Sequence, residues 1–330
     1  MRLLQVVRAG VRRVGVVDGA LVRLVDGPAS VVAVAEAAFL SGRSLEEAAA
    51  ARLSAETLDY DAIHAGASEW RILPPADHPV EPARCVVTGT GLTHSSSAKS
   101  RNAMHASAEE LTDSMRVYRW GLEGGRPAEG RVGVAPEWFY KGTGAVLRGH
   151  LDPLEIPVFG EDGGEEAELA GVYWIDPSGT PRRLGMAQGN EFSDHRFEKR
   201  NYLYLAGSKL RTCSIGPELV LAPKFVSVPG RVAIERGGAT LWSREIRSGE
   251  EAMCHSLANL EHHHFKFPLH RRPGDVHIHF YGADALSCSE GIVLEDGDTM
   301  TVSFEGFGRP LRNVVRKEAG ADNLVRVAAL

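Results

Sequence analysis

Short apolar runs separated by turn-forming residues fill the first quarter of the chain. They lie at residues 3–7, 14–17 and 20–24. Asp18-Gly19, directly before the third run, is typical of a β-hairpin turn. A helical pattern over residues 30–38 follows. The proline-rich residues 74–82 then indicate a linker, because proline fixes φ and removes a hydrogen-bond donor. The pattern predicts a small N-terminal α+β domain over residues 1–75.

Beyond the linker, strands joined by tight turns dominate the pattern. Pro177-Ser178-Gly179 and Gly237-Gly238 each separate two apolar segments and predict two hairpins. The predicted strands cover residues 168–176, 182–188, 231–236, 239–242, 276–281 and 300–304. The predicted helices cover residues 107–121, 198–209 and 249–269. Strands and helices do not alternate regularly, which argues against a doubly wound or TIM-type sheet. We expect an α+β, β-rich fold whose larger domain spans residues 84–330.

Composition and charge narrow the class of protein and its partners. Of the 330 residues, 43% are hydrophobic and 24% are charged, which is enough apolar material for a core. The net charge of −6, without blocks of like charge, gives no basic footprint for nucleic acid or membrane. The start of the chain is not typical of a signal peptide, and the four cysteines lack CxxC spacing. We therefore expect a cytoplasmic chain with reduced thiols.

An acidic cluster opens the strand predicted at residues 168–176. Glu166 and Glu168 are two residues apart and project from the same face of a strand, where two carboxylates repel unless a cation lies between them. Glu191 lies at the end of the partner strand in the same hairpin. Three converging carboxylates give the oxygen ligation that suits Mg²⁺ or Mn²⁺, with Ca²⁺ as a further alternative. The same spacing also fits a solvated acidic loop over residues 162–168.

The segments that follow the acidic cluster occur in a characteristic order. Lys209 lies seven residues before Gly216-Pro217, and residues 294–298 lead through a strand to residues 306–313, which read Gly-Phe-Gly-Arg-Pro-Leu-Arg-Asn. Together with the Glu-x-Glu pair, these segments resemble the fumarylacetoacetate hydrolase superfamily. The resemblance covers about residues 84–315 and is strongest to the branch of 2-keto-3-deoxy-aldonate dehydratases.

This resemblance implies a fold and a set of site residues. The fold would be a mixed β-roll or β-sandwich catalytic domain behind a small N-terminal domain. The metal ligands would be Glu166, Glu168 and Glu191, the catalytic lysine Lys209, and the substrate-binding residues Lys141, Ser193 and Tyr281. The chain departs from the family at two positions. Glu191 stands where an aspartate is usual, a place that Asp194 could also fill, and Ala283 stands where a substrate-contacting threonine is usual.

Histidines supply the candidates for a general base. His94 occupies the place where hydrolytic relatives carry a histidine three residues before a glutamate, but Ser95-Ser96-Ser97 follows it here. We expect His94 to be the base, with a capping or surface role as its alternative. His105 and Glu109 share a helical face at i, i+4 and form an alternative dyad.

Two further groups of histidines have structural interpretations. Consecutive residues on a helix point in different directions, so residues 262–264 cannot together bind one metal ion, and we expect them to be structural. His277 and His279 share a strand face, which leaves a cupin-like metal site as an alternative.

The resemblance implies a Mg²⁺-dependent dehydratase, a lyase acting on a 2-keto-3-deoxy sugar acid such as 2-keto-3-deoxyarabinonate in sugar-acid catabolism. One alternative is a metal-dependent hydrolase that cleaves the C–C bond of an acylpyruvate or 2,4-diketo acid. Another is a non-catalytic sugar-acid binder. The resemblance implies a homodimer, and we expect a small 2-keto acid as the partner, with no nucleic acid or membrane.

Overall fold

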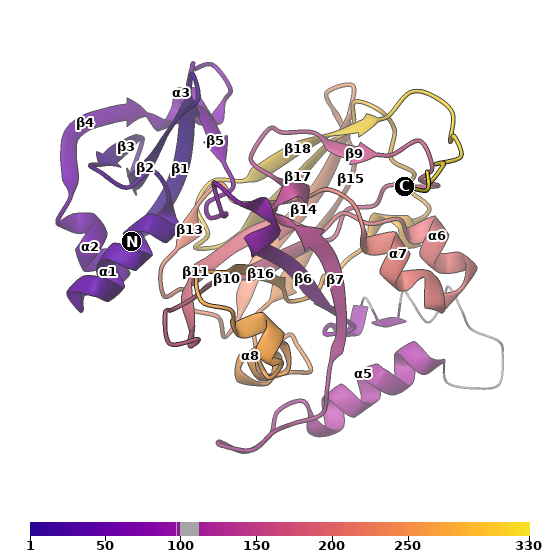
Figure 1. Cartoon of the computed structure of the whole chain (residues 1–330). Helices are drawn as coiled ribbons and strands as arrows, with labels where there is room; N and C mark the ends of the chain where they lie inside the picture. Colours follow the sequence, from indigo (N-terminus) through magenta and orange to yellow (C-terminus); the bar gives the residue numbers. More distant parts are fainter. Residues whose placement is uncertain (97, 100–111) are drawn as a thin grey trace.

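Two β-sheets organise the computed structural model, which describes residues 1–96, 98–99 and 112–330 (Figure 1). The first sheet begins with β1 (Arg2–Arg8), β2 (Val11–Asp18), β3 (Leu21–Val25), β4 (Leu53–Asp59) and β5 (Arg71–Leu73). It continues with β6 (Cys85–Gly91), β7 (Glu137–Thr143), β8 (Leu147–Arg148), β10 (Ala167–Ile175), β11 (Pro181–Asn190), β12 (Cys213–Ile215), β13 (Leu219–Val220) and β16 (Val276–Phe280). The second sheet contains β9 (Leu154–Ile156), β14 (Val228–Arg236), β15 (Ala239–Ser248), β17 (Thr299–Phe304) and β18 (Leu311–Lys317). The expected strand-rich α+β fold is confirmed.

The N-terminal strands extend the same sheet that carries the predicted site. β1 pairs with β2 and β5, and its residues Arg2 and Leu3 pair with Val220 and Leu219 of β13. The predicted turn at Asp18-Gly19 joins β2 to β3, and Gly19 has a φ of 61°. Backbone hydrogen bonds therefore tie the first quarter of the chain to the rest. The separate domain over residues 1–75 stays a prediction.

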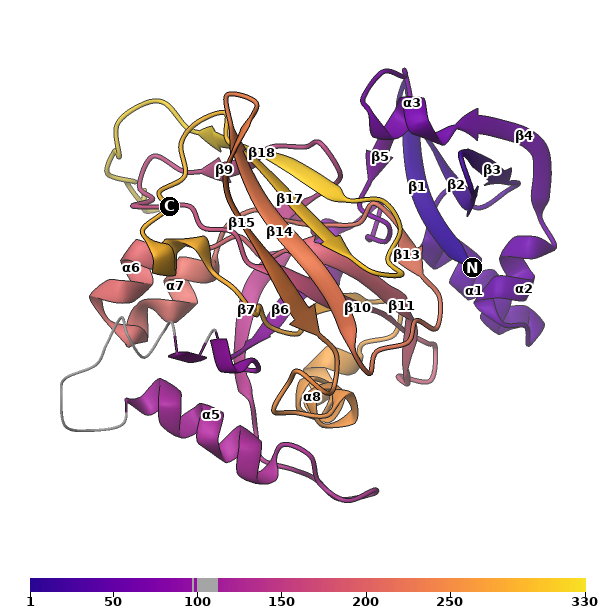
Figure 2. The same ribbon diagram turned by 180° about the vertical axis from the view of Figure 1, so that it is seen from behind.

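The hairpin β10–β11 lies at the centre of the molecule, between two hydrophobic layers. Every residue of β10 is buried. Ala170 and Val172 belong to the layer shared with β16 and the N-terminal helices. Leu169 packs with Val232 and Val302 of the second sheet, which lies across the hairpin (Figure 2). A strand buried on both faces has a fixed register, and this register positions the acidic residues at its start.

Two of the predicted helices, over residues 198–209 and 249–269, are shorter than the apolar pattern predicts, whereas the one predicted over residues 30–38 is α1 (Val31–Ser41) and slightly longer. The described helices are α1, α2 (Leu45–Ala50), α3 (Tyr60–His64), α5 (Asp113–Gly124), α6 (His195–Arg200), α7 (Leu205–Lys209) and α8 (Leu257–Phe265). The helix predicted over residues 249–269 reduces to α8, because Ser256 caps its start. The helix predicted over residues 198–209 is interrupted between α6 and α7. Of the helix predicted over residues 107–121, residues 107–111 lie outside the described residues. No helix in the described part of the chain is long and apolar enough to cross a membrane.

Candidate metal and active site

The hairpin β10–β11 brings three carboxylates together. The alternation of strand residues puts Glu166 and Glu168 on one face, and the backbone N–H of Glu191 donates to the carbonyl oxygen of Glu166 at 2.9 Å. Each of the three residues offers a carboxylate oxygen, and these oxygens all lie within 4.8 Å of one another. Residues 162–168 are all buried, so the alternative of a solvated acidic loop is wrong.

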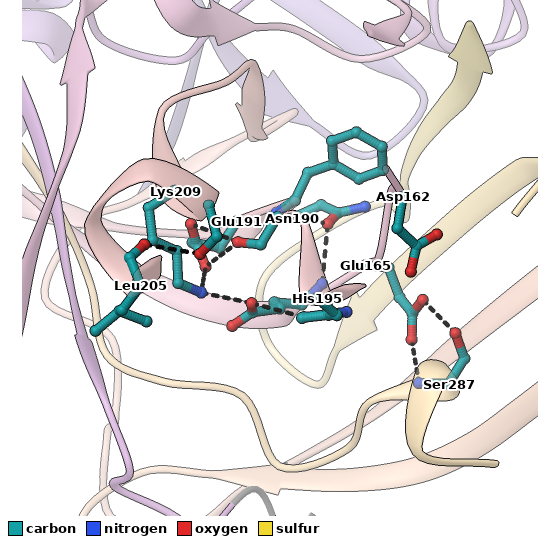
Figure 3. Close-up of polar contacts among 12 residues, drawn as sticks. Asp162, Glu165, Asn190, Glu191, His195, Leu205, Lys209 and Ser287 are labelled. Atoms are coloured by element: carbon teal, nitrogen blue, oxygen red, sulfur yellow. Dashed lines mark hydrogen bonds and ion pairs between the residues drawn. The ribbon is translucent and has the colours of Figure 1, made fainter. Parts of the chain in front are cut away.

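Two buried side chains, Lys209 and His195, donate hydrogen bonds to Glu166, and Figure 3 labels both donors. The Lys209 ammonium bridges Oε1 of Glu166 and Oε2 of Glu191, at 2.5 Å from each. His195 Nε2 donates to the same oxygen of Glu166 at 2.9 Å. These bonds place Lys209 directly beside Glu166 and Glu191, two of the three predicted ligands, and its catalytic role stays a prediction.

Glu168 carries the least compensated charge of the three. Its Oε2 accepts a hydrogen bond from the backbone N–H of Gly282 at 2.7 Å. Burial, and then the charges of Glu166 and Glu191, raise the pKa of Glu168 well above its usual value. Burial is the largest influence on Glu166 and opposes its ionisation, but Lys209 and His195 together outweigh burial and hold the pKa of Glu166 well below its usual range. A divalent cation beside Glu168 would stabilise its ionised form.

The arrangement of the oxygens fits a hard divalent cation. In the described part of the chain, Oε2 of Glu166 and Oε1 of Glu168 have no hydrogen-bond partner, because the donors bind the opposite oxygen of each carboxylate. Both oxygens are therefore available as ligands. Carboxylate oxygens alone suit Mg²⁺, Mn²⁺ or Ca²⁺ better than softer metals.

Lys141 and Ser193, both predicted to bind substrate, contact Glu191. The completely buried Lys141 ammonium lies 2.7 Å from Oε1 of Glu191 and donates to the carbonyl oxygens of Phe192 and Lys209 at 2.5 and 2.9 Å. The Ser193 hydroxyl lies 3.0 Å from Oε2 of Glu191. In this structure both side chains hold the third carboxylate, and their contact with substrate stays a prediction.

The hydroxyl of Tyr281 bonds to another tyrosine and has no hydrogen bond to the three carboxylates among the described residues. It lies 2.6 Å from the hydroxyl of Tyr173, which donates to Glu261 at 2.9 Å. Gly171 makes room for the two rings, since a Cβ there would lie 2.0 Å from the Tyr281 hydroxyl. The structure therefore gives this hydroxyl a partner within the protein, and a substrate contact through it stays a prediction.

His94 is buried and connected to the carboxylate group through the backbone after β16. The Thr93 hydroxyl donates to the carbonyl oxygen of Tyr281 at 2.7 Å, so it accepts from Nδ1–H of His94 at 2.9 Å. The neighbouring residue Gly282 donates to Glu168. Burial lowers the pKa of His94 to about 4, so its imidazole is neutral at neutral pH. This tautomer carries its basic lone pair on Nε2.

The other candidate ligands lie elsewhere. Asp194 caps α6 and pairs with Arg211 at 2.8 Å, so it does not replace Glu191 in the carboxylate group. His279 is hydrogen-bonded to two threonines, and His277 to His264. Within the described residues, the three glutamates are the one group whose ligand atoms converge for a metal ion, so the cupin-like alternative is not supported. His105 and Glu109 lie outside the described residues.

His195 and Glu165 are functional candidates that the sequence analysis did not assign. Glu165 accepts hydrogen bonds from the backbone and hydroxyl of Ser287, at 2.7 and 2.5 Å, and anchors the 3-10 helix Ser287–Glu290 beside the site (Figure 3). In the sequence, the one signal for a role of His195 at the site is its position four residues after the predicted ligand Glu191. Alone, it does not show which carboxylate the ring contacts.

The sequence matches no protein-family model and no curated protein. Solved structures do match. 2-Keto-3-deoxyarabinonate dehydratase aligns over 97% of this chain and 100% of its own, with 20% identity and a TM-score of 0.73. A structure of 2-keto-3-deoxy-D-arabinonate dehydratase complexed with magnesium and 2,5-dioxopentanoate gives the same values. The chain has the fold of these dehydratases.

The same fold extends to isomerases. 5-Carboxymethyl-2-hydroxymuconate delta-isomerase from Mycobacterium smegmatis matches with 17% identity and a TM-score of 0.60, over 97% of this chain and 100% of its own. The fold expected from the resemblance to the fumarylacetoacetate hydrolase superfamily is thus confirmed. Because reactions differ among proteins of one fold, the reaction must be argued from the site.

Proposed function

We propose that this protein is a Mg²⁺-dependent dehydratase of a 2-keto-3-deoxy sugar acid, with 2-keto-3-deoxyarabinonate as the first candidate. The observation that carries the proposal is the buried group of three carboxylates, two of which Lys209 bridges. The proposal is also supported by a comparison: the chain shares its fold with a dehydratase whose structure is complexed with magnesium and 2,5-dioxopentanoate.

Glu166, Glu168 and Glu191 would hold the cation. When bound, Mg²⁺ acts as a Lewis acid that polarises the carbonyl of a 2-keto acid and makes its C3 proton more acidic. Lys141 and Ser193 keep Glu191 in place.

Lys209 and His94 have complementary roles in this proposal. Nε2 of His94 takes the proton from C3, and the electron pair of the C3–H bond moves toward the C2 oxygen. The Lys209 ammonium stabilises the negative charge that develops there. The electron pair then returns to form the C3=C4 double bond as the C4–O bond breaks, and the leaving hydroxide takes the proton held by His94, so that one water is lost overall. Burial keeps His94 neutral and hence able to accept the proton.

The test is an assay with defined substrates. The purified protein is incubated with Mg²⁺ and, separately, with a panel of 2-keto-3-deoxy aldonates and of acylpyruvates. We expect mass spectrometry to detect loss of one water from an aldonate. Carbon–carbon cleavage of an acylpyruvate would instead identify a hydrolase. Saturable binding without turnover of either class would identify a sugar-acid binder.

We also propose a cytoplasmic homodimer. All four cysteines are free, as expected where thiols stay reduced. Sedimentation at micromolar concentrations tests the dimer, since a monomer would contradict it.

A further inference from the structure

Each of the three carboxylates is held differently. Glu168 is held by the backbone N–H of Gly282, two residues after the end of β16, and Glu191 by the buried donors Lys141 and Ser193. Glu166 accepts from Lys209 and His195. Lys209 is assigned to the substrate in the proposed function, so it cannot be the donor that keeps Glu166 fixed throughout turnover. His195 is not assigned to the substrate, so it can hold Glu166 throughout turnover.

We propose that His195 is a positioning residue that fixes Glu166 for the cation. Its Nε2–H binds Oε1 of Glu166 at 2.9 Å and leaves Oε2 to face the metal ion. A hydrogen-bond partner of a metal-binding carboxylate fixes its orientation and raises metal affinity. This inference rests on the proposed function, because it assumes that the three carboxylates hold a cation.

The surroundings of His195 are built for this contact. His195 is the first residue of α6, and its N-cap Asp194 accepts from the backbone N–H of Phe197 at 3.0 Å. The same carboxylate pairs with Arg211 at 2.8 Å, which fixes the start of the helix. Gly164 leaves space for the ring, since a Cβ there would lie 2.0 Å from Nδ1 of His195. A side chain at residue 164 would displace the imidazole.

The experiment is Mn²⁺ titration by calorimetry of the full chain, stripped of metal with a chelator. We expect His195→Phe, which cannot donate, to weaken Mn²⁺ binding by about 10–100-fold. His195→Gln keeps an N–H donor on a side chain of similar reach and should stay within about threefold of wild type. Gly164→Ala, which leaves His195 in the chain, should weaken binding as His195→Phe does. His264→Phe removes a buried histidine that has no hydrogen bond to the carboxylates, and serves as the control.

The outcomes separate this inference from the proposed function. Unchanged affinity in both His195→Phe and Gly164→Ala, or an equal loss in His195→Phe and His195→Gln, would overturn the positioning role. A nitrogen coupling in the electron spin echo spectrum of bound Mn²⁺, lost in His195→Phe, would overturn it too, because His195 would then be a ligand. If Glu168→Gln leaves affinity intact, the metal site itself is misplaced.

Discussion

Glu166, directly before β10, and Glu168, its second residue, have pKa values that move in opposite directions. Lys209 and His195 contact Glu166, whereas Glu168 receives a single backbone hydrogen bond. Burial is common to both residues, so the contacts decide the sign of the shift. Glu168 is therefore the carboxylate whose charge depends most on a bound cation.

Glu168→Gln should lose most of the affinity for Mn²⁺ or Mg²⁺. The amide has no charge and is a weaker ligand, so we expect a loss of at least about 100-fold, above the range seen for outer hydrogen-bond partners. Calorimetry measures it. Glu155→Gln, in the half-exposed ion pair with Arg148, is the control. Near wild-type affinity in Glu168→Gln would refute the assignment.

Lys209→Met should lose turnover and retain metal. The ammonium has no lone pair while charged, so it is not a ligand, but it can stabilise the charge that grows on the substrate oxygen. Loss of such a contact typically lowers kcat by about 10²–10³. Steady-state kinetics at saturating Mg²⁺ test this, with the exposed Lys199→Met as the control. Turnover within a few-fold of wild type would show that Lys209 is not catalytic.

For single residues, the sequence predicts which side chains converge but not which groups each side chain contacts. Strand alternation suffices to place Glu166 beside Glu168, since it needs only local geometry. The partners of Lys141 and Tyr281 depend on contacts across 50 to more than 100 residues, such as Lys141 with Glu191 and Tyr281 with Tyr173. No local spacing encodes such contacts.

A layer of buried histidines joins α8 to β16. His264 stacks on His270 and on His279, with ring centroids 4.6 Å apart in each pair, and hydrogen-bonds His277 at 3.0 Å. Burial lowers the pKa of both His277 and His279 to about 3. The layer is thus packed in the neutral form, and the expectation of a structural role for residues 262–264 agrees with the place of His264 in it.

This layer predicts that stability falls on acidification. The pKa of His279 lies near 6.5 in the unfolded chain and at about 3 in the folded one, so below pH 6.5 the unfolded state binds more protons. The free energy of unfolding should then decrease by about 1.4 kcal/mol per pH unit for each such histidine. Urea unfolding at pH 7 and pH 5 measures it. His279→Gln should reduce the slope, and the exposed His262→Gln should not. Equal slopes in all three proteins would contradict the prediction.

Hairpins were predicted better than helices. The turns at residues 177–179 and 237–238 carry their own conformational signal in glycine and proline, and both hairpins are present. The helix pattern over residues 249–269 extended too far because apolar residues in the turns before and after α8 also fit a helical period. Neither β6, rich in glycine and threonine, nor β7, with three consecutive aromatic residues between glutamate and lysine, shows an apolar alternation, so the pattern does not predict these strands.

For the whole molecule, one buried carboxylate gathers several of the contacts that, with the pairing of β1 and β13, connect the first quarter of the chain to the rest. Glu218 lies directly before β13. Its carboxylate forms an ion pair with Arg2 at 2.8 Å and accepts a hydrogen bond from the Tyr60 hydroxyl at 2.7 Å. It also accepts from the backbone N–H of Arg309, whose guanidinium lies 3.8 Å above the Tyr60 ring. Gly308 is required beside it, since a Cβ there would lie 2.3 Å from this carboxylate.

Glu218→Ala should loosen this connection. Removing the carboxylate leaves a buried tyrosine hydroxyl and a backbone N–H without their acceptor, so we expect the free energy of unfolding to fall by about 3–5 kcal/mol. Urea unfolding measures this loss. Glu56→Ala, which removes a half-exposed ion pair with Arg13, should cost less than about 1 kcal/mol. A similar small effect in Glu218→Ala would show that the strand pairing alone holds the two parts together.

The predicted domain boundary can be tested by limited proteolysis. Pro74 and Asp77 are held by Gln5, and the exposed part of the linker begins only after them, with Val80 86% exposed. We expect a nonspecific protease to cut first within residues 78–81, because exposed loop backbone is cleaved before paired strands. The two fragments should stay together on size-exclusion chromatography in the wild type, since the pairing of β1 with β13 survives the cut. They should separate at lower urea in Glu218→Ala. A first cut within β10 or β11, or fragments of the wild type that separate without denaturant, would contradict this organisation.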